Sequence, residues 1–96
     1  MAENFTRFDA VEFLKTPEEM AAYLGACFEE DAGDGVLIRA ALNDIARAKG
    51  MTQIARDAGL GRESLYKALS SSGNPEFATI MKVMKALGLR LHAIAV

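Results

Sequence analysis

Apolar side chains recur with a helical period over much of the chain. Within residues 17–30 they fall at steps of four, three and one, which puts them on one face of a helix. Residues 35–49 show a similar pattern, so two consecutive amphipathic helices are expected. The expected buried positions are Met20, Leu24, Cys27 and Phe28 in the first helix and Leu37 or Ile38, Ala41, Leu42, Ile45 and Ala48 in the second.

Local signals indicate where the helices begin and end. Thr16 suits an N-cap position, Pro17 suits the first helical position, and Glu19 completes a capping box with the threonine. Gly50 is a natural stop for the second helix. Shortly after it, Thr52 is expected to cap a further helix.

A third apolar stripe lies towards the C-terminus. Asn74 and Pro75 form a cap and first-position pair, and Gly88 is a stop, so a helix is expected over residues 75–87. Its expected stripe consists of Phe77, Ile80, Met81, Met84 and Leu87.

The two ends of the chain carry different signals. Residues 1–8 are expected to be loosely held, and Asp9 is expected to cap a short helix over residues 10–14. The tail LRLHAIAV (89–96) lacks helix stop signals and is rich in alternating and β-branched residues, which predicts a short strand. A lone strand needs a partner, and the same strand of a second copy is the simplest one, so a homodimer is expected.

The segment TQIARDAGLGRESLYKAL (52–69) predicts two short helices joined by a glycine turn. Ala55 is small enough for the crossing of the two helices, and Gly59 suits a turn that needs a positive φ. Leu65 can point into the core from the second helix, which is expected over residues 62–70. The other expected inward positions are Ile54, Ala58, Leu60, Ala68 and Leu69. This is the residue pattern of a helix-turn-helix, which in many proteins binds DNA.

The polar side chains of this segment are the candidate DNA contacts. Arg62 can bind O6 and N7 of guanine, and Glu63 can accept a hydrogen bond from N4 of cytosine. Tyr66 can donate to a phosphate or contact a thymine methyl group, and Lys67 suits a phosphate. Gln53, at the start of the first of the two helices, suits a backbone phosphate. The candidate DNA-binding set is Gln53, Arg62, Glu63, Tyr66, Lys67 and Ser70.

Composition indicates one globular unit rather than a disordered or membrane-spanning chain. The 96 residues are enough for one small core, and 51% of them are hydrophobic. No apolar run approaches the roughly 20 residues that a membrane span needs, and the N-terminus does not resemble a secretory signal. One cysteine gives no disulfide framework, so a cytoplasmic location is expected.

The net charge of −2 conceals two halves of opposite sign. Residues 1–36 hold nine acidic and two basic side chains, whereas residues 37–96 hold nine basic and four acidic ones. The acidic part suggests a basic partner and the basic part suggests a nucleic acid, although balanced charge within one domain is the simpler alternative.

The sequence offers little catalytic or metal chemistry. His92 has no cysteine or acidic cluster beside it, Cys27 lies on an apolar helix face, and the serines at 70–72 have no base partner. No phosphate-binding glycine loop or cofactor fingerprint occurs. We therefore expect a protein that is not an enzyme and holds neither a metal nor another cofactor.

Several stretches resemble known helix-turn-helix proteins. GNPEFATIMKVMKALGLRL (73–91) is similar to the segment after the recognition helix in the lambda-repressor-like (Cro/C1-type, XRE) superfamily. More narrowly, residues 42–91 resemble the addiction-module antidote, or prophage DNA-binding, proteins, and residues 8–30 resemble their N-terminal region. The most specific part of the resemblance is GRESLYKALSSSGNPEF (61–77).

The resemblance implies an antitoxin of a type II toxin-antitoxin module, which binds a small RelE-like toxin and represses its own operon through double-stranded operator DNA. We expect an all-α fold, a five-helix lambda-repressor-like helix-turn-helix domain with the short C-terminal β-strand. Within the chain we expect an N-terminal acidic helical segment over residues 1–34 and a helix-turn-helix DNA-binding domain, with the strand, over residues 35–96. Gly61 departs from the family because a serine N-cap usually stands there, and the spacing from Gln53 to Ala55 is shorter than in typical Cro/C1 proteins.

Two alternatives stay open at this point. A prophage-type helix-turn-helix regulator would bind DNA without any toxin partner, and the neighbouring gene would distinguish it. A pure interaction module would have an ordinary helical hairpin with a solvated charged face, and binding to its own promoter would distinguish it.

Overall fold

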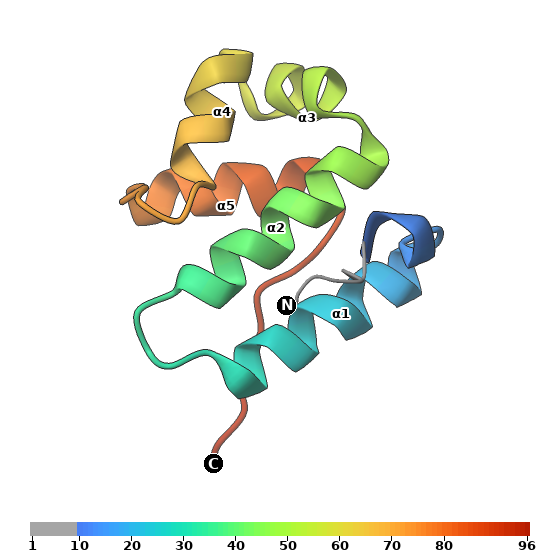
Figure 1. Ribbon diagram of the computed structural model, residues 1–96, viewed down its shortest axis with the longest axis vertical. Helices are drawn as coiled ribbons and strands as arrows, with labels where there is room; N and C mark the ends of the chain where they lie inside the picture. The colour runs from blue at the N-terminus through green and yellow to red at the C-terminus, as the bar shows by residue number, and fades with distance from the viewer. Residues whose placement is uncertain (1–9) are drawn as a thin grey trace, which may run out of the picture.

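The computed structural model describes residues 10–96 and is built from helices (Figure 1). The elements are a short 3₁₀ helix η1 (Ala10–Phe13) and five α-helices: α1 (Pro17–Glu30), α2 (Val36–Lys49), α3 (Met51–Ala58), α4 (Arg62–Ala68) and α5 (Phe77–Ala86). The expected all-α class with five α-helices is confirmed. The expectations for residues 1–8 and for the cap at Asp9 lie outside the described residues. None of the described helices is long and apolar enough to cross a membrane.

The start of α1 is fixed by side chains next to it in sequence. The Thr16 hydroxyl accepts a hydrogen bond from the Glu19 N–H at 3.1 Å, and the Glu19 carboxylate accepts one from the Thr16 N–H at 2.9 Å. Pro17 occupies the first turn, where its missing N–H costs nothing. The predicted capping box is therefore confirmed, because two otherwise unpaired N–H groups are satisfied reciprocally.

One hydrophobic core joins all five α-helices. α1 packs along α2, and α3 packs against both α2 and α5, so that α3 and α4 form one end of the molecule (Figure 1). The buried side chains include Leu24 in α1, Leu42 and Ile45 in α2, Ile54 in α3, Leu65 in α4 and Val83 in α5. The division into residues 1–34 and 35–96 stays a prediction; its boundary falls in the loop between α1 and α2.

Some of the expected buried positions are wrong. In α1, Phe28 is 44% exposed. In α2 the core uses Ile38, one of the two alternatives, and not Leu37, together with the unpredicted Ala46. An apolar stripe on a helix is several residues wide, so the sequence pattern alone does not determine which edge of the stripe faces the core.

The last helix begins later than expected. α5 starts at Phe77, so the pair Asn74–Pro75 lies in the connection before it and does not form the helix start. Phe77 is then 67% exposed, at the outer end of the helix, whereas Val83 is completely buried. The stripe that packs on the core is Ile80, Val83, Met84 and Leu87, with Met81 exposed. Gly88, with a φ of 75°, follows the helix as the expected stop.

A single glycine connects α2 to α3. The Gly50 N–H donates to the Ala46 carbonyl at 2.8 Å and closes α2, while its own carbonyl accepts from the Ile54 N–H at 3.0 Å and opens α3. Its φ of 109° is a backbone conformation that favours glycine. Because Gly50 is the N-cap of α3, the expectation that Thr52 caps this helix is wrong, and Thr52 is the second helical residue.

The expected C-terminal strand is not confirmed. Residues 89–96 have no regular secondary structure, because no other strand exists in the described part of the chain to pair with them. Leu89 and Leu91 still pack against the core, whereas Ile94 is 79% exposed. Pairing of this tail with a second copy stays a prediction.

Candidate nucleic-acid interface

The turn between α3 and α4 depends on Gly59. This residue has a φ of 72° and a ψ of 30°, the left-handed conformation in which a Cβ atom would be strained. Its N–H donates to the Arg56 carbonyl at 3.1 Å, and the Leu60 N–H donates to the Ala55 carbonyl at 2.8 Å. These two bonds form a Schellman motif, which closes α3 and redirects the chain into α4. The expected helix, glycine turn and second helix are therefore all present.

Two sets of contacts fix the position of α4: its buried side chains and hydrogen bonds at its C-terminal end. Leu65 and Leu69 are buried in the core. The Arg39 guanidinium, on α2, donates from Nε to the Ser70 carbonyl and from Nη2 to the Ser71 carbonyl, both at 3.2 Å. These bonds tie the end of α4 to α2 across 31 positions of sequence. Sequence reasoning missed Arg39, since an arginine in an amphipathic helix carries no signal for such a contact.

The outward face of α4 carries four of the predicted DNA contacts. Arg62, Glu63, Tyr66 and Lys67 are all exposed. The Arg62 Nη2 donates to the Tyr66 hydroxyl at 3.3 Å, and its guanidinium carbon lies 5.5 Å from the centre of the Tyr66 ring. Stacking of this kind orders a long side chain at the surface, so Arg62 is already directed along the exposed face.

The other two predicted contacts have different surroundings. Gln53 is exposed on the first turn of α3, but its amide nitrogen donates to Asp57 at 2.8 Å, on the same helix. Ser70 is half-buried, and its hydroxyl donates to the Lys67 carbonyl at 2.8 Å. The second helix ends at Ala68, not at Ser70 as expected, so Ser70 belongs to the loop that closes α4 rather than to its outward face.

A hollow beside α4 gathers three arginines from three helices: Arg47 at the end of α2, Arg56 on α3 and Arg62 on α4. The other residues that line it are Gly50, Met51, Thr52, Gln53 and Tyr66. No acidic side chain is among these lining residues. The first turn of α3 also borders the hollow, and no side chain caps its N–H groups. This combination of guanidinium groups and N–H groups suits a phosphate.

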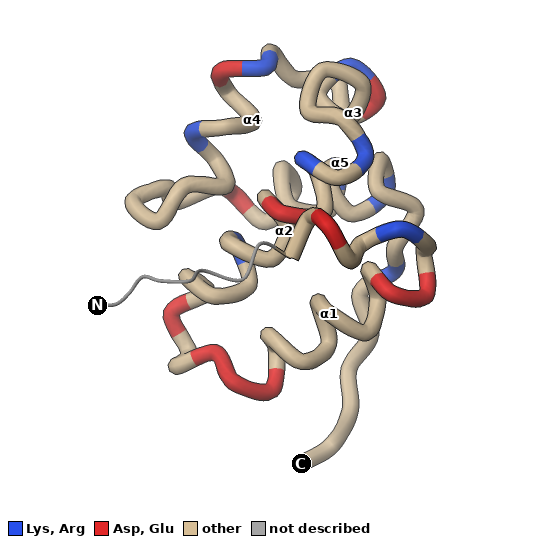
Figure 2. The backbone as a smooth tube through the Cα atoms, turned by 45° about the vertical axis from the view of Figure 1, so that its right-hand side comes forward, with Lys and Arg blue, Asp and Glu red and all other residues tan. Residues whose placement is uncertain are grey.

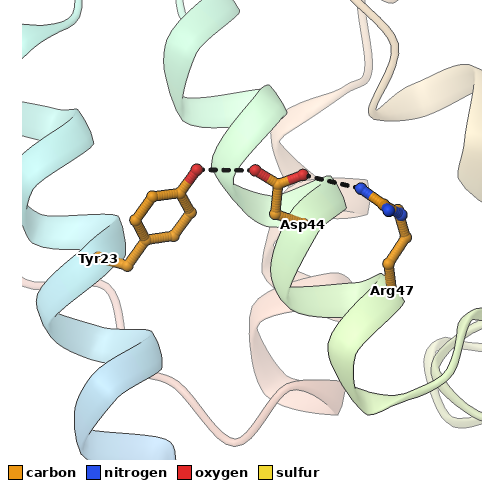
Figure 3. Close-up of polar contacts among 3 residues, drawn as sticks. All are labelled: Tyr23, Asp44 and Arg47. Atoms are coloured by element: carbon orange, nitrogen blue, oxygen red, sulfur yellow. Dashed lines mark hydrogen bonds and ion pairs between the residues drawn. The ribbon is translucent and has the colours of Figure 1, made fainter. Parts of the chain in front are cut away.

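Arg47 is connected across α2 to α1 (Figure 3). The Tyr23 hydroxyl, on α1, donates to Asp44 Oδ2 at 2.7 Å, and Arg47 Nη1 donates to Asp44 Oδ1 at 3.2 Å. Each oxygen of the Asp44 carboxylate therefore accepts one hydrogen bond, Oδ2 from Tyr23 and Oδ1 from Arg47. Sequence reasoning missed this chain of contacts because its ends lie on different helices.

Charge is distributed unevenly over the fold. Figure 2 shows the acidic positions that follow α1 at the opposite end of the molecule from α4. One of them, Asp31, belongs to the loop structure: it accepts hydrogen bonds from the N–H groups of Gly35, Gly33 and Leu37. These bonds, the one from Gly35 foremost, hold the pKa of Asp31 below its ordinary value. Asp31 is therefore a cap, and the free acidic character of this end rests on other side chains.

The residues set aside as unreactive have ordinary environments. Cys27 is buried as expected, and burial, helped by the charge of Asp44, raises the pKa of its thiol, which favours the unreactive protonated form. His92 is exposed in the C-terminal tail. Within residues 10–96 no group of three or more histidine, cysteine or acidic side chains could hold a metal ion.

Comparison with known proteins gives the chain a family. A family model described as "Probable addiction module antidote protein" matches residues 4–95. An uncharacterised protein of Haemophilus influenzae (strain Rd) is 57% identical over 92 residues, which cover 96% of this chain and 93% of that protein. No solved structure matches the chain. With 92 residues matched end to end, the chain belongs to the family of probable addiction module antidote proteins.

Proposed function

We propose that this protein is the DNA-binding antitoxin of a type II toxin-antitoxin module. In this proposal it acts in the cytoplasm, neutralises a small RelE-like toxin, represses its own operon and has no enzymatic activity. Membership of an antidote family implies a toxin partner of some kind. The RelE-like class of that partner comes from the resemblance of residues 42–91 to the addiction-module antidote, or prophage DNA-binding, proteins.

The observation that carries the DNA-binding half is the exposed face of α4 beside the arginine-lined hollow. In the proposed complex α4 enters a major groove, where Arg62 binds guanine and Glu63 contacts cytosine. Tyr66 and Lys67 lie further along the exposed face and reach the groove edge or the phosphates. The hollow beside α4 then faces the sugar-phosphate backbone, where most protein–DNA contacts are made.

Two roles in the predicted set change once the side-chain contacts are considered. Gln53 must release Asp57 before its amide can bind a phosphate, so we assign the main phosphate contacts at the hollow to arginine. Ser70 stabilises the end of α4 through the Lys67 carbonyl, so we assign it a supporting role. Both assignments follow from bonds that these side chains make within the chain.

The proposed active form is a homodimer. Paired helix-turn-helix units usually bind half-sites about 34–36 Å apart, so a dimer can place two copies of α4 in successive major grooves on one side of DNA. The unpaired tail, residues 89–96, supports a second copy as the partner that completes the expected strand.

The toxin contact is proposed at the acidic end of the molecule. Glu29 and Glu30 are exposed at the end of α1. A small basic toxin would be attracted to this end, which lies away from α4 and leaves the DNA face accessible.

The DNA-binding half is tested on the promoter of the protein's own operon. The wild-type protein should bind this duplex more tightly than a random one, and more weakly as salt rises, since phosphate contacts release counterions. Arg62→Ala should cost about 1–3 kcal/mol and relax the preference for one base pair. Equal binding to promoter and random DNA, unchanged by this substitution, would exclude specific repression.

The toxin half needs a separate experiment. The genes beside this one are searched for a small basic reading frame, which is then expressed with and without this protein while cell survival and co-purification are measured. Rescue with a stable complex is the expected result. Lethality that persists, without a complex, would favour the second candidate, a prophage-type regulator with no toxin, for which the arginine-lined hollow and exposed α4 face are sufficient.

A further inference from the structure

We infer that Tyr23, on α1, is a positioning residue for DNA binding, which acts through Asp44 on Arg47. The inference rests on the proposed DNA-binding function and assigns one phosphate contact to Arg47. It gives α1, which packs along α2, an influence on the proposed DNA face through two side chains of α2.

The first step concerns Arg47 itself. Its side chain is 42% exposed, stands on the last turn of α2 and lines the hollow together with Arg56 and Arg62. Ordering a long arginine side chain on a phosphate costs rotamer entropy. Any contact that holds the guanidinium at the hollow before DNA arrives reduces this cost.

The second step concerns the ion pair with Asp44. Arg47 Nη1 lies 3.2 Å from Asp44 Oδ1, one turn earlier on the same helix. An exposed pair of this kind is weak by itself, because the carboxylate can rotate and water competes for it. Asp44 is more buried than Arg47, with 24% of its side chain exposed, and this burial makes a further contact to it more effective.

The third step brings in Tyr23. Its hydroxyl donates to the second oxygen of Asp44 at 2.7 Å, and this bond crosses from α1 to α2 (Figure 3). With both oxygens engaged, the carboxylate plane is fixed and directs Oδ1 towards Arg47. A phenylalanine at position 23 would keep the aromatic ring and remove the hydroxyl that donates to Asp44.

The test measures binding of the wild type and four variants to a labelled promoter duplex by fluorescence anisotropy. Arg47→Ala should weaken binding about tenfold, the size expected for one charge-assisted phosphate contact. Its plot of log K against log salt should be shallower by about 0.9, the value for one phosphate. Tyr23→Phe should weaken binding about threefold, a fraction of the Arg47 effect, because the charge remains but is less ordered.

The double variant Tyr23→Phe/Arg47→Ala distinguishes positioning from a general structural effect. If Tyr23 acts through Arg47, the double variant should bind no more weakly than Arg47→Ala. Ala22→Ser, a neutral change at an exposed position of α1, is the matched control and should bind like the wild type. NMR of the Arg47 Nε–H group in the free protein gives a second readout, and its signal should shift or broaden in Tyr23→Phe.

Two results would overturn the inference and leave the proposed function intact. One is wild-type affinity in Tyr23→Phe with an unchanged Arg47 signal. The other is an equal loss from Tyr23→Phe in the wild-type and Arg47→Ala backgrounds, which would indicate a structural effect. Absence of specific binding by the wild type would overturn the proposed function and this inference together.

Discussion

The region around α1 and the region around α3 and α4 use their charged side chains in different ways. Around α1, Glu19 caps the helix and Asp31 accepts three backbone N–H groups, so these acids hold the fold together. Around α3 and α4, Arg47, Arg56 and Arg62 line an open hollow, and each donates a hydrogen bond to a side chain near it: Asp44, Gln53 and Tyr66, respectively. A count of charged residues therefore does not describe a binding surface, because it does not say which charged side chains already hydrogen-bond to the backbone of the fold.

Arg39 is a basic side chain that binds backbone groups of the fold. Its guanidinium donates to the carbonyl oxygens of Ser70, Ser71 and Asp34 and thus serves the fold as Asp31 does. The comparison therefore concerns the contacts of each side chain rather than the sign of its charge, and it can be tested by substitutions at either end.

The largest effect is expected from Leu65→Ala, which tests whether both ends share one core. Leu65 is completely buried beneath α4, so its truncation should lower the free energy of unfolding by about 2–5 kcal/mol. Urea unfolding followed by far-UV circular dichroism gives this value. Leu37→Ala is the control, because Leu37 is 37% exposed and should cost much less. Amide exchange should also accelerate in α1; unchanged protection there would mean that the two ends unfold separately.

Arg56→Ala should affect DNA binding and leave stability unchanged. Arg56 is exposed and lines the hollow, so its loss should weaken binding by about tenfold for every DNA sequence and reduce the salt slope by about 0.9. Anisotropy titrations at several salt concentrations measure both quantities. Lys82→Ala, an exposed change on α5 outside the hollow, is the control for lost positive charge. Equal losses from both variants would show that general charge, rather than the hollow, determines affinity.

Thr16→Ala, at the start of α1, should lower stability and leave DNA binding unchanged. The substitution removes one half of the capping box and should cost about 1 kcal/mol of unfolding free energy. DNA affinity under folding conditions should stay at the wild-type value, because Thr16 caps α1 and is not among the residues that line the hollow or form α4. A serine at this position should restore most of the loss, since it retains the hydroxyl acceptor. A change in DNA affinity for Thr16→Ala would contradict the conclusion that the capping contacts of α1 serve the fold and not DNA binding.

Asp31→Asn is expected to give the smallest effect, and it depends on pH. Hydrogen bonds from backbone N–H groups lower the folded-state pKa of Asp31, so the ionised form stabilises the fold. This contribution is complete above the ordinary pKa of an unfolded aspartate and is lost as pH falls through the lowered folded-state pKa. The wild type should therefore exceed the variant in stability at neutral pH, and the two should converge in acid. The same difference in unfolding free energy between wild type and variant at every pH would contradict this expectation.

Local features were predictable because each depends on residues close in sequence. The capping box needs only Thr16 and Glu19, and the stops need only a glycine such as Gly50 or Gly59 that can adopt a positive φ. The cap expected at Thr52 failed for a local reason as well. Gly50 ends one helix and begins the next, and no sequence rule signalled that one residue would do both.

Packing decided which residues of each stripe are buried. Val83 rather than Phe77 fills the core: Phe77 is the first residue of α5 and is 67% exposed, whereas Val83 lies on the face that packs on the core. The candidate contacts show the same division: Arg62 and Tyr66 are exposed as predicted, whereas Ser70 is engaged in closing α4. Their roles in binding DNA stay predictions.

The sequence by itself determined the helices, their main boundaries, the glycine turn between α3 and α4 and the opposite charge of the two halves. These properties follow from the period of apolar residues and from short-range hydrogen bonding, which act within a few positions of the chain. Only the tertiary structure decided that Arg39 secures the end of α4, that three arginines surround one hollow, and that Tyr23 reaches Asp44. The partners in these contacts lie on different helices, and the shared core alone brings them together.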